Sequence, residues 1–156
     1  MPIRIISCGK VYRKDSDRTH SPMFHQLEGL YLDKNIGFSD LKGTITKFLH
    51  NFFNKKINIR WRSSTFPFTE PSCEIDIQCQ CINKLKKCNL CKGSKWIEVM
   101  GAGLVNPIVL NNIGIDSKKF TGFAFGLGIE RFSMIYYNIG DIKIFFENKL
   151  QNLYVF

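Results

Sequence analysis

Alternation of apolar and polar residues constrains the fold of this chain more than any other feature of its sequence. It runs through residues 3–13 and again through residues 24–32. A period of two is typical of a strand whose two faces meet different surroundings. The residues between them, KDSDRTHSPM at 14–23, are polar and contain a proline, so we expect a loop there. The pattern therefore predicts a long antiparallel hairpin.

The remaining segments carry strand and helix signals in turn. Further strands are expected at residues 57–62, 73–78, 95–100 and 121–127, with a rigid extended segment, TFPFTEP, at 65–71. Helices are expected from an N-cap at Ser39 to about Phe53, from Pro107, and over residues 128–138. The amphipathic tail from Asp141 should dock on the body. We therefore predict a single α+β domain over residues 1–156, an antiparallel sheet flanked by helices.

Charge and hydropathy indicate the cellular compartment of the protein more clearly than its function. The formal net charge is +9, which would attract polyanions such as tRNA or ATP. The alternative is an AT-rich genome that favours lysine, asparagine and isoleucine, so charge alone does not establish nucleic-acid binding. No apolar stretch of about 18 residues is present, which excludes a membrane-spanning helix, and the N-terminus does not resemble a signal peptide. We expect a cytoplasmic protein.

One face of the predicted hairpin gathers groups suited to a nucleotide and an amino group. Period two places Phe24, Gln26 and Glu28 on the same face, close to where Arg13 ends the first strand. That face would offer an aromatic platform, an amide and a carboxylate in a row. The alternative is a solvated sheet face that carries a single aromatic residue.

A second candidate segment is TGFAFGLGIERFSM at 121–134, where glycines interrupt an apolar strand that leads into a helix. Small residues allow a ligand to approach the backbone closely. Arg131 falls in the first helical turn, where the helix dipole disfavours a cation, so the guanidinium is expected to have an anionic partner. The alternative is a glycine-rich connection with a surface arginine.

Four of the six cysteines crowd into one short segment, with the spacing Cys-x-Cys-x₆-Cys-x₂-Cys: Cys79, Cys81, Cys88 and Cys91. In a chain without a secretory signal this spacing favours a tetrahedral zinc site over disulfides. The alternative is a loop of free thiols. Cys73 is a possible substitute ligand, and Cys8 is expected to be a small core residue.

These segments together resemble a known family. GKVYRKD followed by its return strand resembles motif 2 of class II aminoacyl-tRNA synthetases, and GFAFGLGIERF resembles motif 3. THSPMFHQLEG, FPFTEPSCEIDI, KWIEVMGAGLVNP and DIKIFFENKL resemble bacterial phenylalanyl-tRNA synthetase α subunits, over nearly all of residues 2–156. The resemblance implies a class II synthetase-like sheet and an ATP-dependent phenylalanine–tRNA ligase.

The resemblance also implies roles for individual residues. Arg13 would bind the α-phosphate of ATP and His20 would lie near the β- and γ-phosphates, with adenine stacked between Phe24 and Arg131. Arg13 and Arg131 would be the main electrostatic stabilisers of the reaction.

The same resemblance assigns the amino-acid side of the site. Gln26 and Glu28 would bind the amino end of phenylalanine. Phe66 and Phe68 of the FPF segment would meet the substrate ring edge to face, and Ala124 and Gly126 would line the pocket and leave room for it. Glu98 would help to place Mg²⁺ or make an amide contact, or would be a surface strand residue.

The wider implications concern metals and partners. ATP, Mg²⁺ and a structural Zn²⁺ in a knuckle over residues 79–91 are expected, with L-phenylalanine, tRNA(Phe) and a β subunit in an αβ heterotetramer as partners. Because the chain opens just before motif 2, we expect an N-terminally incomplete catalytic core. The competing hypotheses are a non-catalytic synthetase-like binding module or inactive fragment, and a small zinc-knuckle RNA-binding protein.

Overall fold

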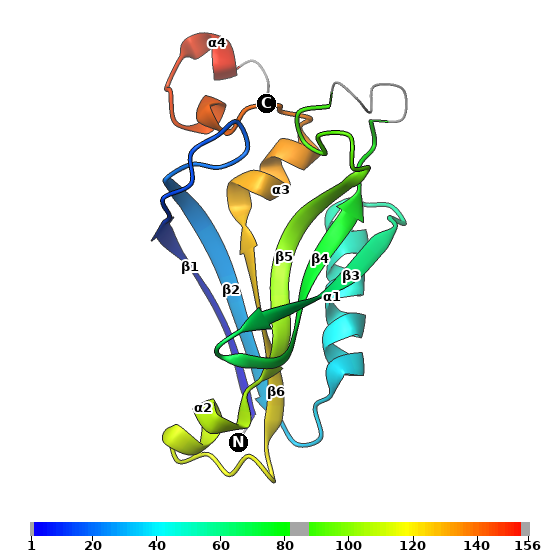
Figure 1. Cartoon of the computed structure of the whole chain (residues 1–156), viewed down its shortest axis with the longest axis vertical. Helices are drawn as coiled ribbons and strands as arrows, with labels where there is room; N and C mark the ends of the chain where they lie inside the picture. Colours follow the sequence, from blue (N-terminus) through cyan, green and yellow to red (C-terminus); the bar gives the residue numbers. More distant parts are fainter. Residues whose placement is uncertain (1, 82–87, 154–156) are drawn as a thin grey trace.

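Six strands form one antiparallel sheet in the computed structural model, which describes residues 2–81 and 88–153. The strands are β1 (Ile3–Tyr12), β2 (Met23–Asp33), β3 (Ile59–Phe66), β4 (Thr69–Gln78), β5 (Trp96–Val105) and β6 (Thr121–Gly128). Their order is β1-β2-β6-β5-β4-β3, and every neighbouring pair is antiparallel. Figure 1 shows the sheet as a twisted, curved layer. The predicted antiparallel sheet is confirmed.

The first hairpin forms as predicted from alternation. Its register runs without a bulge from Ile3 opposite Leu32 to Tyr12 opposite Met23. Because β1 is the edge strand, almost all of its residues are exposed. The expectation that Cys8 is a core residue is therefore wrong: Cys8 is exposed on β1.

The second hairpin, formed by β3 and β4, has longer strands than the sequence pattern predicted. The expected strand 57–62 overlaps β3 only from Ile59, and β3 continues to Phe66. The expected strand 73–78 is the second part of β4, which begins at Thr69. The segment predicted to be extended and rigid, 65–71, is thus the end of one strand, a tight turn and the start of the next. The hydroxyl of Ser72 supports this turn, since it donates to the Thr69 carbonyl oxygen at 2.6 Å.

Helix α1 (Phe38–Phe52) supplies the cover for one face of the sheet. Its N-cap is Gly37 and not the predicted Ser39, which lies inside the first turn. The reason is local, because the Asp40 carboxylate accepts a hydrogen bond from the Gly37 N–H at 2.8 Å and so satisfies a free donor at the helix end. The apolar stripe predicted from helical spacing is confirmed, with Leu41, Ile45 and Leu49 buried.

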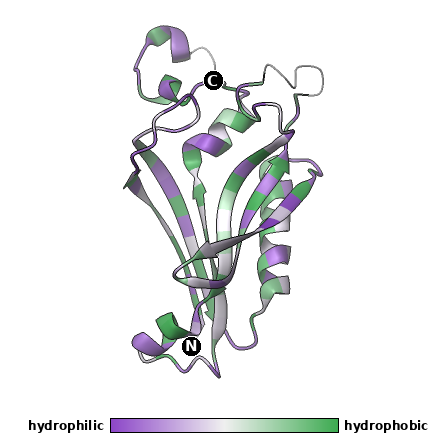
Figure 2. Cartoon of the chain, in the orientation of Figure 1, coloured by the Kyte–Doolittle hydropathy of each residue, from purple (hydrophilic) through white to green (hydrophobic). Residues whose placement is uncertain are grey.

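The main core lies between α1 and the sheet. It joins the α1 stripe to buried residues of β4, β5 and β6, among them Ile75, Ile77, Ile97, Met100 and Phe123. Each such side chain contributes about 1.5–3 kcal/mol by leaving water. Figure 2 shows hydrophobic and hydrophilic bands alternating along α1 and the strands, as expected for elements buried on one side only.

The remaining helices lie at the two ends of the sheet (Figure 1). Helix α2 (Pro107–Asn112) is capped by the Asn106 side chain, which accepts from the Ile108 N–H, and α3 (Ile129–Tyr136) follows β6 directly. The tail contains the 3₁₀ helix η2 (Ile142–Phe145) and α4 (Leu150–Leu153). Its predicted docking is confirmed at Ile142, which is buried with Met134 and Ile139. No helix in the described part of the chain is long and apolar enough to cross a membrane.

Candidate functional site

A cavity of about 670 Å³ lies on the face of the sheet that α1 leaves uncovered. Strands β2, β4, β5 and β6 contribute its walls, together with the β1–β2 loop and the first turn of α3. Its volume falls within the range of sites for small molecules. The cavity brings together all of the predicted nucleotide and amino-acid ligands: Arg13, His20, Phe24, Gln26, Glu28, Phe66, Phe68, Glu98, Ala124, Gly126 and Arg131.

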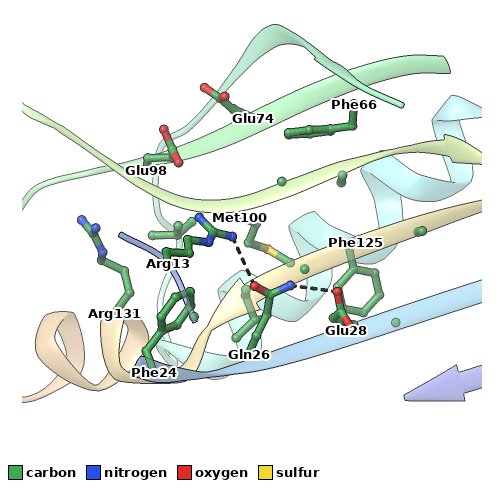
Figure 3. Close-up of a pocket in the computed structure, with 18 of the residues that line it drawn as sticks. Arg13, Phe24, Gln26, Glu28, Phe66, Glu74, Glu98, Met100, Phe125 and Arg131 are labelled. Carbon is green, nitrogen blue, oxygen red and sulfur yellow. Dashed lines mark hydrogen bonds between the residues drawn. The ribbon is translucent and has the colours of Figure 1, made fainter. Parts of the chain in front are cut away.

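The hairpin side chains form a connected row along one wall, as alternation predicted. A guanidinium N–H of Arg13 donates to Gln26 Oε1 at 3.4 Å, and Gln26 Nε2 donates to Glu28 Oε1 at 2.8 Å. The Arg13 guanidinium also lies 5.2 Å from the centre of the Phe24 ring, within cation–π range. Figure 3 shows Phe24, Gln26 and Glu28 on β2 and Arg13, which follows β1, pointing into the cavity. The wall therefore offers a cation and an aromatic face beside an amide and a carboxylate.

Arg131 reaches the cavity from the first turn of α3. Its guanidinium contacts the Thr19 carbonyl oxygen at 3.2 Å and His20 Nε2 at 3.0 Å. Burial lowers the pKa of Arg131, while the charges of Glu98 and Asp17 raise it. In the described part of the chain no carboxylate forms an ion pair with this guanidinium. A partly buried cation whose hydrogen-bond partners are a carbonyl oxygen and an imidazole nitrogen is suited to an anionic ligand.

The β1–β2 loop is held in place by Asp17, a residue that the sequence interpretation missed. Its carboxylate accepts from the Thr19 N–H at 2.6 Å and contacts His20 Nδ1 at 2.9 Å. The bond from Thr19 holds the pKa of Asp17 well below its usual range. A proton on His20 Nδ1 would leave Nε2 free to accept from Arg131. Asp17 could have been found from the Asp-x-Thr spacing, which is typical of a side chain that binds the backbone two residues further along the chain.

The apolar end of the cavity is formed around the FPF segment. The rings of Phe66 and Phe68 stack in parallel, with centroids 6.0 Å apart and planes 7° from each other. Phe66 lies over Gly101, where an added Cβ would come within 3.0 Å of the ring. Ala124 and Gly126 line the same cavity. This end can therefore accept a flat apolar group against aromatic rings and small residues.

An acidic wall faces the arginines. Glu98 on β5 and Glu74 on β4 line the cavity, and Figure 3 places both carboxylates across from Arg13 and Arg131. Only Glu98 was singled out from the sequence. The alternation in SCEIDI places Glu74 and Asp76 on one face, but which face meets the cavity depends on strand order, which the sequence does not reveal.

Three further lining residues were also missed: Met100, Phe125 and Glu130. Glu130 is buried and accepts from the His25 backbone N–H at 2.9 Å and contacts His25 Nδ1 at 2.6 Å. These bonds join α3 to β2 beneath the site. Their separation of 105 residues in sequence explains why no local pattern indicated them.

The four clustered cysteines form a second candidate site, which we call the cysteine cluster: Cys79, Cys81, Cys88 and Cys91. Their sulfur atoms all lie within 4.8 Å of one another, with Cys79–Cys88 at 3.7 Å and Cys81–Cys91 at 3.3 Å. Tetrahedral zinc with Zn–S bonds of about 2.3 Å separates its sulfur ligands by about 3.8 Å. The donor set and spacing therefore fit zinc. Residues 82–87 of the predicted knuckle lie outside the described residues.

The thiols of the cysteine cluster differ in their environments. Burial raises the pKa values of Cys79 and Cys81. Burial also acts on Cys88, but the backbone N–H groups of Cys91 and Leu90 outweigh it and lower the pKa of Cys88 to about 7. The suggested substitute ligand, Cys73, lies apart from the cluster: its thiol is buried in β4 and donates to the Ala102 carbonyl oxygen at 3.4 Å.

Comparison with known families identifies the class of protein. The family model described as the tRNA synthetases class II core domain (F) matches residues 1–156. The chain belongs to this family. Its six-stranded antiparallel sheet and the cavity on the sheet agree with the fold that the motif 2 and motif 3 resemblances predicted.

Several similar curated proteins share one name, phenylalanine–tRNA ligase alpha subunit. The protein of Cellvibrio japonicus is 56% identical over 153 residues, and those of Pseudomonas fluorescens and Ectopseudomonas mendocina are 55% identical over 152 residues. In each case the match covers 97% of this chain and 45% of the relative. The chain thus spans just under half the length of the curated relatives it matches.

Proposed function

We propose that this chain forms the adenylation site of a phenylalanine–tRNA ligase α subunit, which activates L-phenylalanine with ATP and transfers it to tRNA(Phe). The observation that carries the proposal is the cavity itself, where Arg13, Phe24 and the partly buried Arg131 meet a Gln26–Glu28 pair. A basic, aromatic half lies beside an apolar half, as a nucleotide and an aromatic amino acid together require. The names and identities of the relatives point the same way.

The nucleotide half would be built from the arginines. Arg13 would bind the α-phosphate and Arg131, aided by His20, the outer phosphates, with adenine between Phe24 and Arg131. Guanidinium groups suit this task because they combine permanent charge, several donors and a flat stacking surface. As the substrate carboxylate attacks the α-phosphorus and pyrophosphate leaves, both guanidinium groups would stabilise the developing negative charge.

The amino-acid half would be built from β2, β6 and the FPF turn. Gln26 and Glu28 would hold the ammonium group, since they offer an amide oxygen and a carboxylate. Phe66 and Phe68 would contact the substrate ring, and Ala124 and Gly126 would leave room for it. Because this room depends on small side chains, a larger residue at position 124 should exclude the phenyl ring.

Metals and partners complete the proposal. Mg²⁺ would neutralise phosphate charge when bound, and Glu98 would hold it, since its carboxylate lines the cavity opposite Arg131. A structural Zn²⁺ would be held by the cysteine cluster, on the evidence of its sulfur spacing. A β subunit and tRNA(Phe) are the proposed macromolecular partners, and the cytoplasm is the proposed compartment.

Phenylalanine-dependent ATP–pyrophosphate exchange tests the proposal. It should be measured with the chain alone and with the β subunit of a related ligase added. Exchange that needs phenylalanine, and that leucine does not support, is the expected result. A folded, zinc-loaded chain that exchanges in neither condition would favour a non-catalytic binding module instead.

A further inference from the structure

Arg62 lies on β3 outside the cavity lining, yet it contacts both acidic residues of the cavity wall. A guanidinium N–H pairs with Glu74 Oε2 at 2.7 Å, and another donates to Glu98 Oε2 at 3.1 Å. These two carboxylates come from different strands, β4 and β5. One side chain on the third strand therefore ties together the acidic wall that faces Arg131.

The orientation of Arg62 is fixed by a buried anchor, Asp76. Two parallel bonds join them, from Arg62 Nε to Oδ2 at 2.7 Å and from a terminal nitrogen to Oδ1 at 2.9 Å. Asp76 is only 1% exposed. Burial alone would raise its pKa, but bonds from Arg62 and Arg60 lower it, so the carboxylate is charged. Such a two-pronged pair fixes the plane of a guanidinium, which a single ammonium contact cannot do.

The strand register explains why these groups meet. Arg62 lies directly opposite Glu74, and Asp76 lies opposite both Arg60 and Glu98. The five side chains thus form one patch on the cavity face of three strands. The patch carries three carboxylates against two guanidinium groups, so removing one cation would leave two uncompensated negative charges beside the phosphate site.

We propose that Arg62 is a positioning residue: anchored on Asp76, it holds the Glu74 and Glu98 carboxylates in the orientation in which the cavity accepts metal-bound nucleotide phosphates. This inference rests on the proposed function. Without Arg62, Glu98 would lose the partner that orients it and Glu74 would keep only the bond from the Ser64 hydroxyl at 3.0 Å, while the charge of both carboxylates would repel the polyphosphate. Partners that orient metal-binding groups change metal affinity or activity by about 10–100-fold when altered.

Arg60 provides a matched control. It lies two residues away on β3, binds the same Asp76 carboxylate at 2.7–2.8 Å and is similarly exposed, 43% against 38% for Arg62. In the described part of the chain it makes no ion pair with Glu74 or Glu98. Arg60→Lys and Arg62→Lys should therefore both weaken the contact with Asp76, while only Arg62→Lys changes the acidic wall.

The experiment compares wild type, Arg62→Lys and Arg60→Lys in pyrophosphate exchange over a range of Mg²⁺ concentrations. Arg62→Lys should raise the KM for ATP about tenfold and move the half-maximal Mg²⁺ concentration upward, with the KM for phenylalanine changed less than about twofold. Arg60→Lys should leave all three constants near wild type. Should Arg62→Lys fail to fold, Glu74→Gln breaks the Arg62–Glu74 pair without touching the Asp76 anchor and should move the half-maximal Mg²⁺ concentration upward by less than about fivefold.

The outcomes separate this inference from the function on which it rests. Equal ATP and Mg²⁺ constants in the two lysine variants, in an active enzyme, would overturn the positioning role alone. Wild-type protein that neither exchanges nor binds ATP with Mg²⁺ in calorimetry would overturn the proposed function, and the role of Arg62 with it.

Discussion

The cavity wall and the cysteine cluster both gather polar groups, but they are held in different ways. In the cavity, the side chains bind one another across strands, from Arg13 to Gln26 to Glu28 and from Arg62 to its three carboxylates. In the cluster, the sulfur atoms have thiol contacts at 3.3 and 3.7 Å, which are weak bonds. The side chains of the wall are therefore held by one another, whereas those of the cluster would be held by the proposed zinc ion.

This difference predicts that removing a side chain that lines the cavity changes chemistry and leaves the fold intact, and that damage to the cluster does the reverse. Among the described residues, an ion pair from Lys92 to Asp17 at 3.2 Å joins the segment next to the cluster to the β1–β2 loop beside the cavity. Lys92 adjoins Cys91, and Asp17 holds His20. The comparison can thus be tested on each side and at this junction.

The largest effect is expected at Arg131. Arg131→Ala removes a partly buried cation from the proposed phosphate site and should lower phenylalanine-dependent pyrophosphate exchange by about 10²–10³-fold. Zinc content and melting temperature should stay near wild type. Arg18→Ala is the control, since Arg18 is an exposed arginine of the β1–β2 loop outside the cavity lining. Full exchange by Arg131→Ala would remove Arg131 from the mechanism.

Removing a cysteine of the cluster should instead lower metal content and stability. Cys88→Ser should reduce bound zinc from about one to well below one per chain and lower the free energy of unfolding by about 3 kcal/mol. For a chain of this size that is a fall in Tm of about 6–12 °C. Cys8→Ser is the control, because Cys8 is exposed and outside the cluster. Equal zinc content in both variants, measured by emission spectroscopy, would show that the cluster binds no metal.

The ion pairs of Asp76, the buried anchor behind the acidic wall, predict that the free energy of unfolding depends on pH. Asp76→Asn should lower the free energy of unfolding by about 2 kcal/mol at neutral pH, less than for a fully buried pair because both arginines are partly exposed. The pKa of Asp76 is lowered in the folded protein, so its contribution is complete above the unfolded pKa of about 3.9 and is lost below it. Denaturant unfolding should show the two proteins converging as the pH falls below about 4. A constant difference down to pH 2 would contradict this account.

Breaking the Lys92–Asp17 ion pair between the two regions should have the smallest effect. Lys92→Ala breaks an exposed ion pair, so the free energy of unfolding should change by less than about 1 kcal/mol and the change should shrink in high salt. The KM for ATP should move less than about twofold, measured beside Lys95→Ala. A tenfold rise for Lys92→Ala alone would mean that the cluster positions the β1–β2 loop, and the two regions would no longer be independent.

Local patterns predicted the elements but not the contacts between distant ones. Alternation was enough to place Phe24, Gln26 and Glu28 on one face, because a period of two decides the face of a strand. The Arg62 contacts depend instead on the register of three strands, including an irregularity between Ile75 and Asp76. The exposure of Cys8 depended on strand order, and the α1 cap on one Asp40 hydrogen bond.

The most direct test of the central claim is calorimetric titration with a non-hydrolysable phenylalanyl-adenylate analogue. The account predicts one binding site per chain, an affinity at least about 100-fold above that for phenylalanine alone, and a large loss of affinity in Arg13→Ala. A folded chain that does not bind the analogue, or that binds it equally well without Arg13, would contradict the claim that this one cavity takes nucleotide and phenylalanine together.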